Sequence, residues 1–211
     1  MNERIDPQRT AAFHITDVSN LAAILARGGL LSDAQMVARA HTNIGYDHIK
    51  QRRLSEIQIG CCPGQPFVGA FVPFYYCPRS VMLFTINRGN TGLAVGCQTT
   101  IIHLVFRVAT LAGLGHDWAI SDGNAGAYHA LFYNELGKLS ELDWAAIRAT
   151  SWKGLTHQKQ AEFLVKDFVP WSAVEMIGCH DEAAASAVRD VLAHGNASHI
   201  PRIEVKRSWY Y

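Results

Sequence analysis

The stretch Gln160-Ala161-Glu162-Phe163-Leu164-Val165 sets one carboxylate into an apolar run that has the alternation of a β-strand. With a side-chain period of two, Phe163 shares one face with Val165, and Glu162 lies on the other. Glutamates are usually exposed, so the pattern alone favours a strand end in water for Glu162. The alternative is a carboxylate that opens onto a cleft.

Outward from this stretch, other segments have the same strand signature. Residues 100–108 alternate between two faces. Strands are expected at residues 11–16, 67–76, 100–108, 162–168, 174–179 and 203–205, and helices at 17–31, 46–57, 128–139, 144–147 and 182–193. Gly28 is expected to end the first helix and Asp143 to begin the fourth. Strands interrupted irregularly by helices predict an α+β fold, and the absence of a linker predicts a single domain over residues 1–211.

The composition excludes several classes of protein. The 19 Lys and Arg residues against 18 Asp and Glu give a net charge of +1, so any contact with nucleic acid must use a local patch. Hydrophobic residues make up 49% of the chain, which is enough for one sizeable core. The charged N-terminus and the lack of a long apolar run predict a cytoplasmic protein with no signal peptide and no membrane contact. The scattered cysteines are expected to be reduced thiols.

The usual catalytic motifs are absent. The sequence contains no Walker loop, no G-x-S-x-G elbow and no H-E-x-x-H pair. The ten histidines could suggest a metal site. However, the sequence has no C-x-x-C pair of metal ligands, and a strand would point Cys179 and His180 to opposite faces. No metal is therefore expected.

Arg53 departs from the ordinary pattern of a surface helix. A helix over residues 46–57 would place Arg53 in a stripe with Tyr46, Ile49 and Ile57. Charges are rarely buried without a partner. The spacing slightly favours a structural role for Arg53, paired to a carboxylate or reaching water, over a functional one.

A second departure is Phe13-His14-Ile15-Thr16, where polar residues alternate with apolar ones just before a helix. Buried polar groups normally find hydrogen-bond partners. The pattern therefore favours a core histidine bonded to backbone over a histidine that contacts a ligand.

Taken in chain order, these features resemble one family, the DarT DNA ADP-ribosyltransferase toxins. The resemblance runs from about residue 11 to the C-terminus. Its matching pieces are Phe13-His14-Ile15-Thr16, Asn20-Leu21, residues 28–31, Arg52-Arg53, Val72-Pro73-Phe74-Tyr75-Tyr76-Cys77-Pro78-Arg79-Ser80, Met82-Leu83, His129, Asp143-Trp144, residues 160–165 and Trp209-Tyr210-Tyr211. The two longest pieces, residues 72–80 and 160–165, are long enough that agreement by chance in this order is not expected.

The resemblance implies an ADP-ribosyltransferase-like fold, with a split antiparallel β-core and surrounding helices that hold NAD in a cleft. It implies transfer of ADP-ribose from NAD, used as a co-substrate, to a base of single-stranded DNA. The NAD contacts that it implies are His14, Ile15, Thr16, Ala23, Leu31 and Arg53. Residues 37–55 are similar to the family's NAD-binding element.

The resemblance also implies the catalytic residues. Glu162 matches the catalytic glutamate, which would hydrogen-bond a hydroxyl of the nicotinamide ribose and stabilise the positive charge that develops as nicotinamide leaves. Arg53 would act as a fixed guanidinium rather than as a base, because the pKa of arginine exceeds about 12. The proton of the acceptor base would pass to Glu162 or to His129. A histidine packed on a helix face is an equal alternative for His129.

For DNA, the candidate contacts are Tyr75, Tyr76, Arg79, Trp152 and Lys159, combining stacking aromatics with cations. Core packing is the alternative for the adjacent tyrosines. Thymidine is the expected acceptor, with guanosine, protein or RNA as alternatives, and a non-enzymatic NAD- or nucleic-acid-binding module as a further one. The resemblance implies a toxin whose partner is a macrodomain antitoxin of the DarG type.

Overall fold

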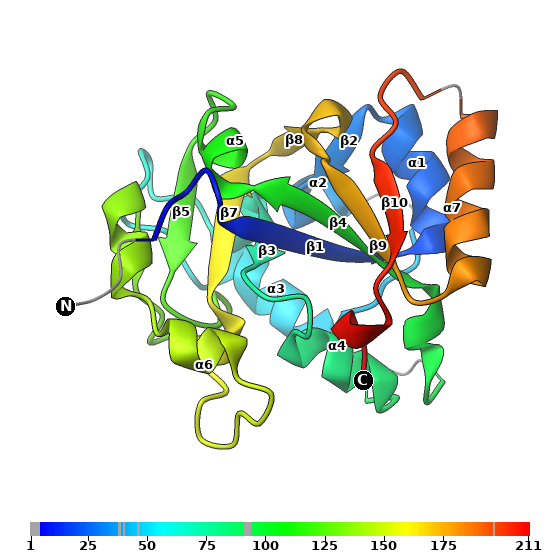
Figure 1. Cartoon of the computed structure of the whole chain (residues 1–211). Coiled ribbons are helices and arrows are strands. Elements are labelled where there is room, and N and C mark those ends of the chain that lie inside the picture. Colours follow the sequence, from blue (N-terminus) through cyan, green and yellow to red (C-terminus); the bar gives the residue numbers. More distant parts are fainter. Residues whose placement is uncertain (1–4, 38, 40, 46, 91–93, 196) are drawn as a thin grey trace.

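The computed structural model describes residues 5–37, 39, 41–45, 47–90, 94–195 and 197–211. Its main feature is a sheet with the strand order β10-β9-β4-β1-β3-β7-β5-β6 (Figure 1). The strands are β1 (Ala11–Asp17), β3 (Phe71–Tyr75), β4 (Ile101–Arg107), β5 (Trp118–Ser121), β6 (Phe132–Tyr133), β7 (Glu162–Lys166), β9 (Met176–Cys179) and β10 (Arg202–Val205). The β9–β10 pair is parallel and the other pairs are antiparallel. A separate small sheet pairs β2 (Gly29–Leu31) with β8 (Phe168–Pro170).

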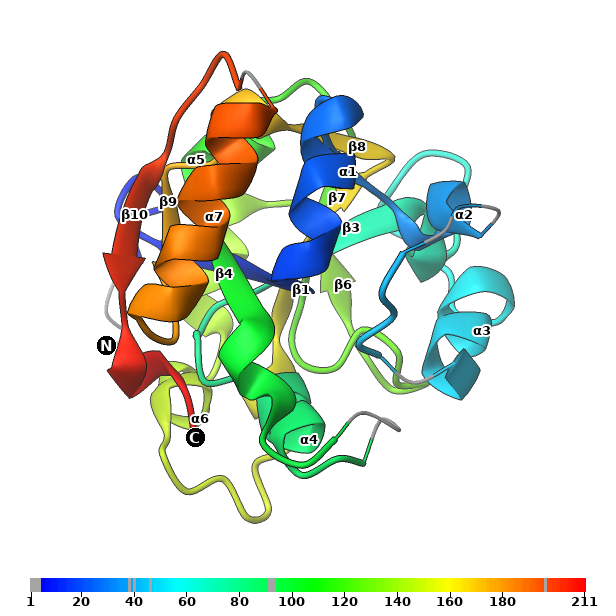
Figure 2. The same ribbon diagram turned by 90° about the vertical axis from the view of Figure 1, so that its right-hand side faces the viewer.

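Short helices surround the sheet. They are α1 (Leu21–Ala26), α2 (Asp33–Met36), α3 (Asp47–Ser55), α4 (Val81–Asn87), α5 (Val108–Ala112), α6 (Trp144–Arg148) and α7 (Glu182–His194). Helices α1 and α7 lie side by side over the β4 and β9 half of the sheet (Figure 2). The mixture of strands and helices confirms the expected α+β fold.

The largest core cluster lies under these helices and along the central strands. Phe74, Phe106 and Phe163 are fully buried in it, with the rings of Phe74 and Phe106 packed edge to face. Strand β4 alternates as the sequence predicts, but both of its faces are buried because helices cover one side and the C-terminal residues the other. Buried aromatic and β-branched side chains therefore fix the register of the strands that carry the site.

The element boundaries differ from the prediction where the chain turns. The expected helix over 17–31 is a short 3₁₀ turn followed by α1, and Gly28 at φ +76° turns the chain into β2. The expected strand over 162–168 is split into β7 and β8 at Asp167, whose φ is +63°. Gly28 ends the helix as predicted, whereas nothing in the local pattern marks Asp167.

The helix expected at residues 128–139 is wrong. Phe132 and Tyr133 form β6, which pairs with Ile120 and Ser121, and a 3₁₀ turn follows at Leu136–Glu141. Phe132 and Tyr133 form backbone hydrogen bonds with the free edge of β5 in place of the hydrogen bonds of a helix. This tertiary pairing overrides the helical period.

The thiols, the possible metal ligands and the helix lengths are as follows. The five cysteines are free thiols. Within the described ranges, no group of His, Cys, Asp and Glu side chains lies close enough to hold a metal ion. The described helices include none with the length and apolar character needed to cross a bilayer.

Candidate active site

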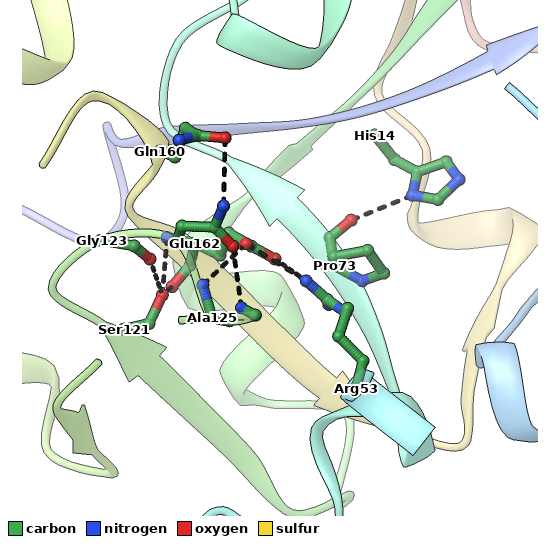
Figure 3. A network of polar contacts seen from close by, with 10 residues as sticks. His14, Arg53, Pro73, Ser121, Gly123, Ala125, Gln160 and Glu162 are labelled. Carbon is green, nitrogen blue, oxygen red and sulfur yellow. Dashed lines mark hydrogen bonds and ion pairs between the residues drawn. The ribbon is translucent and has the colours of Figure 1, made fainter. Parts of the chain in front are cut away.

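A buried ion pair joins α3 to the first residue of β7. The Arg53 Nη1 atom lies 3.1 Å from Oε2 and 3.3 Å from Oε1 of Glu162 (Figure 3). Arg53 is 7% exposed and Glu162 2% exposed. The solvated strand end favoured for Glu162 by pattern alone is therefore wrong, and the buried carboxylate partner expected for Arg53 is Glu162. Tyr46, which was expected in the same helical stripe, lies outside the described residues.

The loop after β5 holds Glu162 from the other side. The backbone N–H of Ala125 donates to Glu162 Oε1 at 3.1 Å. The hydroxyl of Ser121 accepts from the Glu162 N–H at 3.0 Å and donates to the carbonyl of Gly123 at 2.7 Å (Figure 3). Both the backbone and the carboxylate of Glu162 are thus fixed by one turn of chain.

Asn124 in turn fixes that loop. Its Oδ1 accepts from the Gly126 N–H at 2.8 Å, and its Nδ2 donates to Gln160 Oε1 at 3.3 Å. Asn124 and Ser121 are not among the site residues expected from the sequence. The signal was present as a Gly/Asp/Asn-rich loop at residues 121–126, but such loops are common, and only the fold brings this one beside Glu162.

Arg53 retains donors that the protein does not use. Its Nε and Nη2 atoms are buried and have no hydrogen-bond partner among the described residues. Burial opposes its charge, but the nearby charges of Glu162 and Asp33 outweigh burial, so the pKa of Arg53 is raised. Arg53 therefore stays a cation, and its free donors suit an acceptor atom of a ligand.

A cleft opens over this pair. The predicted NAD residues His14, Ile15, Thr16, Leu31 and Arg53 line it, and so do Tyr75 and Glu162. These residues come from β1, β2, α3, β3 and β7, which are far apart in the sequence. The fold thus gathers most of the residues that were predicted separately.

His14 has the backbone hydrogen bond that its pattern favours, and it also faces the cleft. Its Nδ1 lies 3.0 Å from the carbonyl of Pro73, and the ring also lines the cleft (Figure 3). Burial lowers the pKa of His14. A neutral ring that donates from Nδ1 to Pro73 keeps Nε2 as an acceptor.

Some predicted residues lie elsewhere. Ala23 is half-buried on α1 and outside the cleft lining, where Ile24 and Arg27 stand instead. His129 is exposed, and its ring centroid lies 4.3 Å from that of His157. It lies in a turn rather than on a helix, so the helix-face alternative for His129 is wrong.

The candidate DNA residues divide between two places. Tyr75 lines the cleft, whereas Tyr76, Arg79 and Lys159 line a second cavity. Lys159 is 3% exposed, and its Nζ donates to the carbonyl of Ile147 at 2.7 Å. Trp152 lines neither cavity and packs edge to face on Phe84, with ring centroids 5.4 Å apart.

The cleft can stabilise positive charge. A carboxylate held by an arginine and a backbone N–H, with little water around it, is preorganised and needs no rearrangement as charge develops nearby. The donors left on Arg53 can hold an oxygen of a second reactant. This arrangement suits a reaction in which positive charge develops on one reactant while Arg53 holds an oxygen of another.

The chain is similar to proteins of known activity. The family model described as "ssDNA thymidine ADP-ribosyltransferase, DarT" matches residues 13–211. A DNA ADP-ribosyl transferase of Thermus aquaticus is 39% identical over 205 residues, covering 97% of this chain and 90% of the relative.

Solved structures agree with these matches. Thermus sp. 2.9 DarT in complex with ADP-ribosylated ssDNA superimposes with a TM-score of 0.92 at 33% identity, covering 100% of both chains. The same protein in complex with NAD+ superimposes with a TM-score of 0.86 at 31% identity, covering 99% of this chain and 100% of the other. The expected ADP-ribosyltransferase-like fold is thus confirmed, and the chain belongs to the DarT family of single-stranded DNA ADP-ribosyltransferases.

Proposed function

We propose that the chain transfers ADP-ribose from NAD to a thymine base of single-stranded DNA, with Glu162 and Arg53 as its catalytic pair. The observation that carries this assignment is the buried Glu162 carboxylate, fixed by Arg53 and by the Ala125 amide at the floor of the cleft. Membership of the family makes the chain an NAD-dependent DNA ADP-ribosyltransferase. The residue roles are the proposal.

Glu162 acts on the donor sugar. The bond between the anomeric carbon and the nicotinamide nitrogen breaks, and its electron pair leaves with nicotinamide. Glu162 accepts a hydrogen bond from a ribose hydroxyl and stabilises the positive charge left on the sugar. Removal of one such group typically costs about 10²- to 10³-fold in rate.

Arg53 fixes the reacting groups and does not act as a base. Its raised pKa keeps it protonated, so it cannot remove the proton from the thymine ring nitrogen. The guanidinium holds Glu162 through Nη1, and Nε and Nη2 remain to donate to an oxygen of the substrates. The new bond joins the anomeric carbon to the base nitrogen.

The base must also lose its proton. The two candidate acceptors are Glu162 and His129. Glu162 lines the cleft, whereas His129 is exposed and does not line it. We therefore assign the proton to Glu162. The positive charge of the nicotinamide ring passes to the sugar as the donor bond breaks, and it ends on this proton when the base nitrogen bonds to the anomeric carbon.

The remaining cleft residues suit the donor. His14, Ile15, Thr16 and Leu31 line the cleft, and His14 and Thr16 offer polar atoms for the adenosine and ribose side of NAD. Ala23 lies on α1 and does not line the cleft, so any contribution from it is indirect. Tyr75 lies in the β3 register opposite Glu162, where its ring can stack on the acceptor base.

The test is to mix the protein with NAD and single-stranded oligonucleotides of defined composition and to measure their masses. The expected result is a gain of one ADP-ribose on thymine-containing strands alone. A gain confined to thymine-free, guanine-containing strands would overturn the base assignment. Consumption of NAD with no change in the mass of any oligonucleotide would indicate that the acceptor is protein, RNA or water.

We also propose a toxin role in the cytoplasm, with residues 1–211 acting as one transferase domain. An adduct on the pairing edge of thymine would stop the base from pairing in a template. A cell that makes such an adduct needs an enzyme that removes it. A macrodomain antitoxin of the DarG type is the partner that fits this need.

A further inference from the structure

A loop without regular structure forms part of the cleft. Residues 41–45, between α2 and α3, all line the cleft and belong to no helix or strand. Thr42 is exposed, and within the described part of the chain no backbone-to-backbone hydrogen bond joins it to another element. Side chains must therefore hold this loop in place.

The side chain of Asn20 holds the loop. Its Oδ1 accepts from the Thr42 N–H at 2.8 Å, and its Nδ2 donates to the Thr42 carbonyl at 3.0 Å. One amide thus satisfies both backbone groups of Thr42, as a residue of a neighbouring strand would. The hydroxyl groups of Ser19 and Thr42 add a contact at 2.9 Å. Two segments that lie 22 positions apart are therefore joined at one point.

Asn20 also contacts Thr16, which is 6% exposed and lines the cleft. The Nδ2 atom of Asn20 donates to Thr16 Oγ1 at 3.2 Å. Because the Thr42 N–H needs an acceptor, the amide oxygen must face it, and the amide nitrogen must be the atom that reaches Thr16. A hydroxyl that accepts one hydrogen bond keeps its own proton to donate, so Thr16 can donate to an oxygen of a ligand.

The turn that carries Asn20 is itself fixed to the sheet. Asn20 ends the 3₁₀ turn Val18–Asn20, and the N-cap residue Asp17 accepts from the Ser19 N–H at 2.9 Å through Oδ1. The other carboxylate oxygen of Asp17 accepts from the Thr100 hydroxyl at 2.6 Å, just before β4. A side chain on such an anchored turn can hold a partner in one position.

A cation of the cleft depends on the same loop. Lys50 of α3 lines the cleft, and its Nζ lies 3.4 Å from Nε2 of His41 and 3.9 Å from Oδ1 of Asp33. His41 belongs to the loop that Asn20 holds. Displacement of the loop would therefore disturb the polar surroundings of a ligand at the loop, at Thr16 and at Lys50.

We propose that Asn20 is a positioning residue for the donor substrate: it holds residues 41–45 beside β1 and orients the Thr16 hydroxyl, so that NAD meets a preformed site. The proposal rests on the proposed function, because that function places NAD in this cleft. The Glu162 carboxylate is held by other residues. The effect of Asn20 therefore falls on the binding of NAD and not on the chemical step.

The test uses Asn20→Ala, which removes the three hydrogen bonds and adds no charge. The KM for NAD, and the Kd for NAD measured without DNA, should each rise about 10-fold. The value of kcat at saturating NAD and the KM for DNA should not change. Hydrogen exchange of the Thr42 amide should be at least about 10-fold faster, while the amides of β1 and β4 keep their protection. Asn134→Ala, on an exposed asparagine outside the cleft, is the matched control and should bind NAD as the parent protein does.

The double variant Asn20→Ala/Thr16→Val tests whether Asn20 acts through Thr16. Together the two substitutions should raise the Kd for NAD by less than the product of their separate effects. Full multiplication of the effects would overturn the proposal. So would an unchanged Kd for NAD in folded Asn20→Ala, or a loss of kcat with faster exchange throughout the sheet. A parent protein that binds NAD but modifies no oligonucleotide would instead overturn the proposed function and leave the role of Asn20 standing.

Discussion

At the scale of residues, Arg53 and Glu162 each depend on the other for burial. An unpaired charge is costly in the interior, and removal of one partner of a buried pair typically costs about 3–5 kcal/mol. Arg53→Met should lower the free energy of unfolding by about this amount, because Glu162 stays buried without its counter-ion. Urea unfolding at neutral pH measures this loss.

The double variant Arg53→Met/Glu162→Gln is the control for that prediction. The neutral amide needs no counter-ion, so the second substitution should restore part of the stability that the first one removes. Stability losses that simply add, with no coupling between the two sites, would show that the two charges do not support each other.

The sequence predicts the members of this pair but not the pairing. The helical stripe marks Arg53 as an arginine in need of a carboxylate, and the strand pattern marks Glu162 as a carboxylate among apolar residues. The two residues are 109 positions apart, and no local period encodes a contact at that separation. The family resemblance brings both into one site before the structure is seen, but it does not give their burial.

At the scale of elements, the loop between β5 and β6 fixes the Glu162 carboxylate. Asn124→Ala removes the acceptor of the Gly126 N–H and the donor to Gln160, which frees the Ala125 amide from its place on Glu162. We expect kcat to fall about 10-fold, while the KM for NAD changes little. The reason is that a loosely held Glu162 carboxylate stabilises the charged transition state less well, whereas binding of the substrate depends less on it.

Asn134→Ala is the matched control for the loop. Asn134 is an exposed asparagine whose Nδ2 donates to the carbonyl of Cys61, away from Glu162. Its loss should leave kcat unchanged. Equal effects of the two substitutions, or an Asn124→Ala variant that changes stability without changing kcat, would contradict a positioning role for the loop.

Elements with a strong hydrophobic period are predicted well from the sequence. Elements that form only by pairing with another strand are not. The alternation of residues 100–108 matches β4, and Asp143 caps α6 as expected by accepting from the Ala146 N–H. The segment 128–139 has a helical period, yet it forms β6 because the free edge of β5 accepts it. A free edge is a property of the assembled sheet and cannot be seen in a local window.

At the scale of the whole molecule, a buried histidine links the fold to pH. His103 on β4 is fully buried between the carbonyl of Pro78 and the hydroxyl of Tyr210. Burial lowers the pKa of His103 to about 4, against about 6.5 in an unfolded chain. Between these values the unfolded chain binds a proton that the folded chain does not, so stability falls as the pH drops from 6.5 towards 4.

The magnitude is on the order of 3 kcal/mol across that interval. Urea unfolding at pH 7 and pH 4.5 should show the loss, and the NMR titration of the His103 ring should show a neutral imidazole down to about pH 4. A His103 ring that takes up its proton near pH 6.5 in the folded protein would contradict the prediction.

The class of fold follows from the sequence, whereas the assembly does not. Periods of two and of 3.6 residues give strands and helices and hence the α+β class. The order β10-β9-β4-β1-β3-β7-β5-β6 has few neighbours in sequence, so it depends on long-range packing. That order places β1, β3 and β7 side by side and creates the cleft, which is why its lining could be assigned only by resemblance and then by structure.

The most direct test of the account is the Glu162→Gln variant in single-turnover transfer to a thymine oligonucleotide. The amide keeps the size of the side chain and an acceptor for the Ala125 N–H. Because Arg53 loses its counter-ion, the variant should be less stable by about 3–5 kcal/mol, so its folding and its NAD binding are measured beside the rate. The account predicts a loss of about 10²- to 10³-fold in the rate of ADP-ribose transfer. Transfer at close to the parent rate, by a folded variant that binds NAD, would contradict the assignment of Glu162 as the catalytic carboxylate.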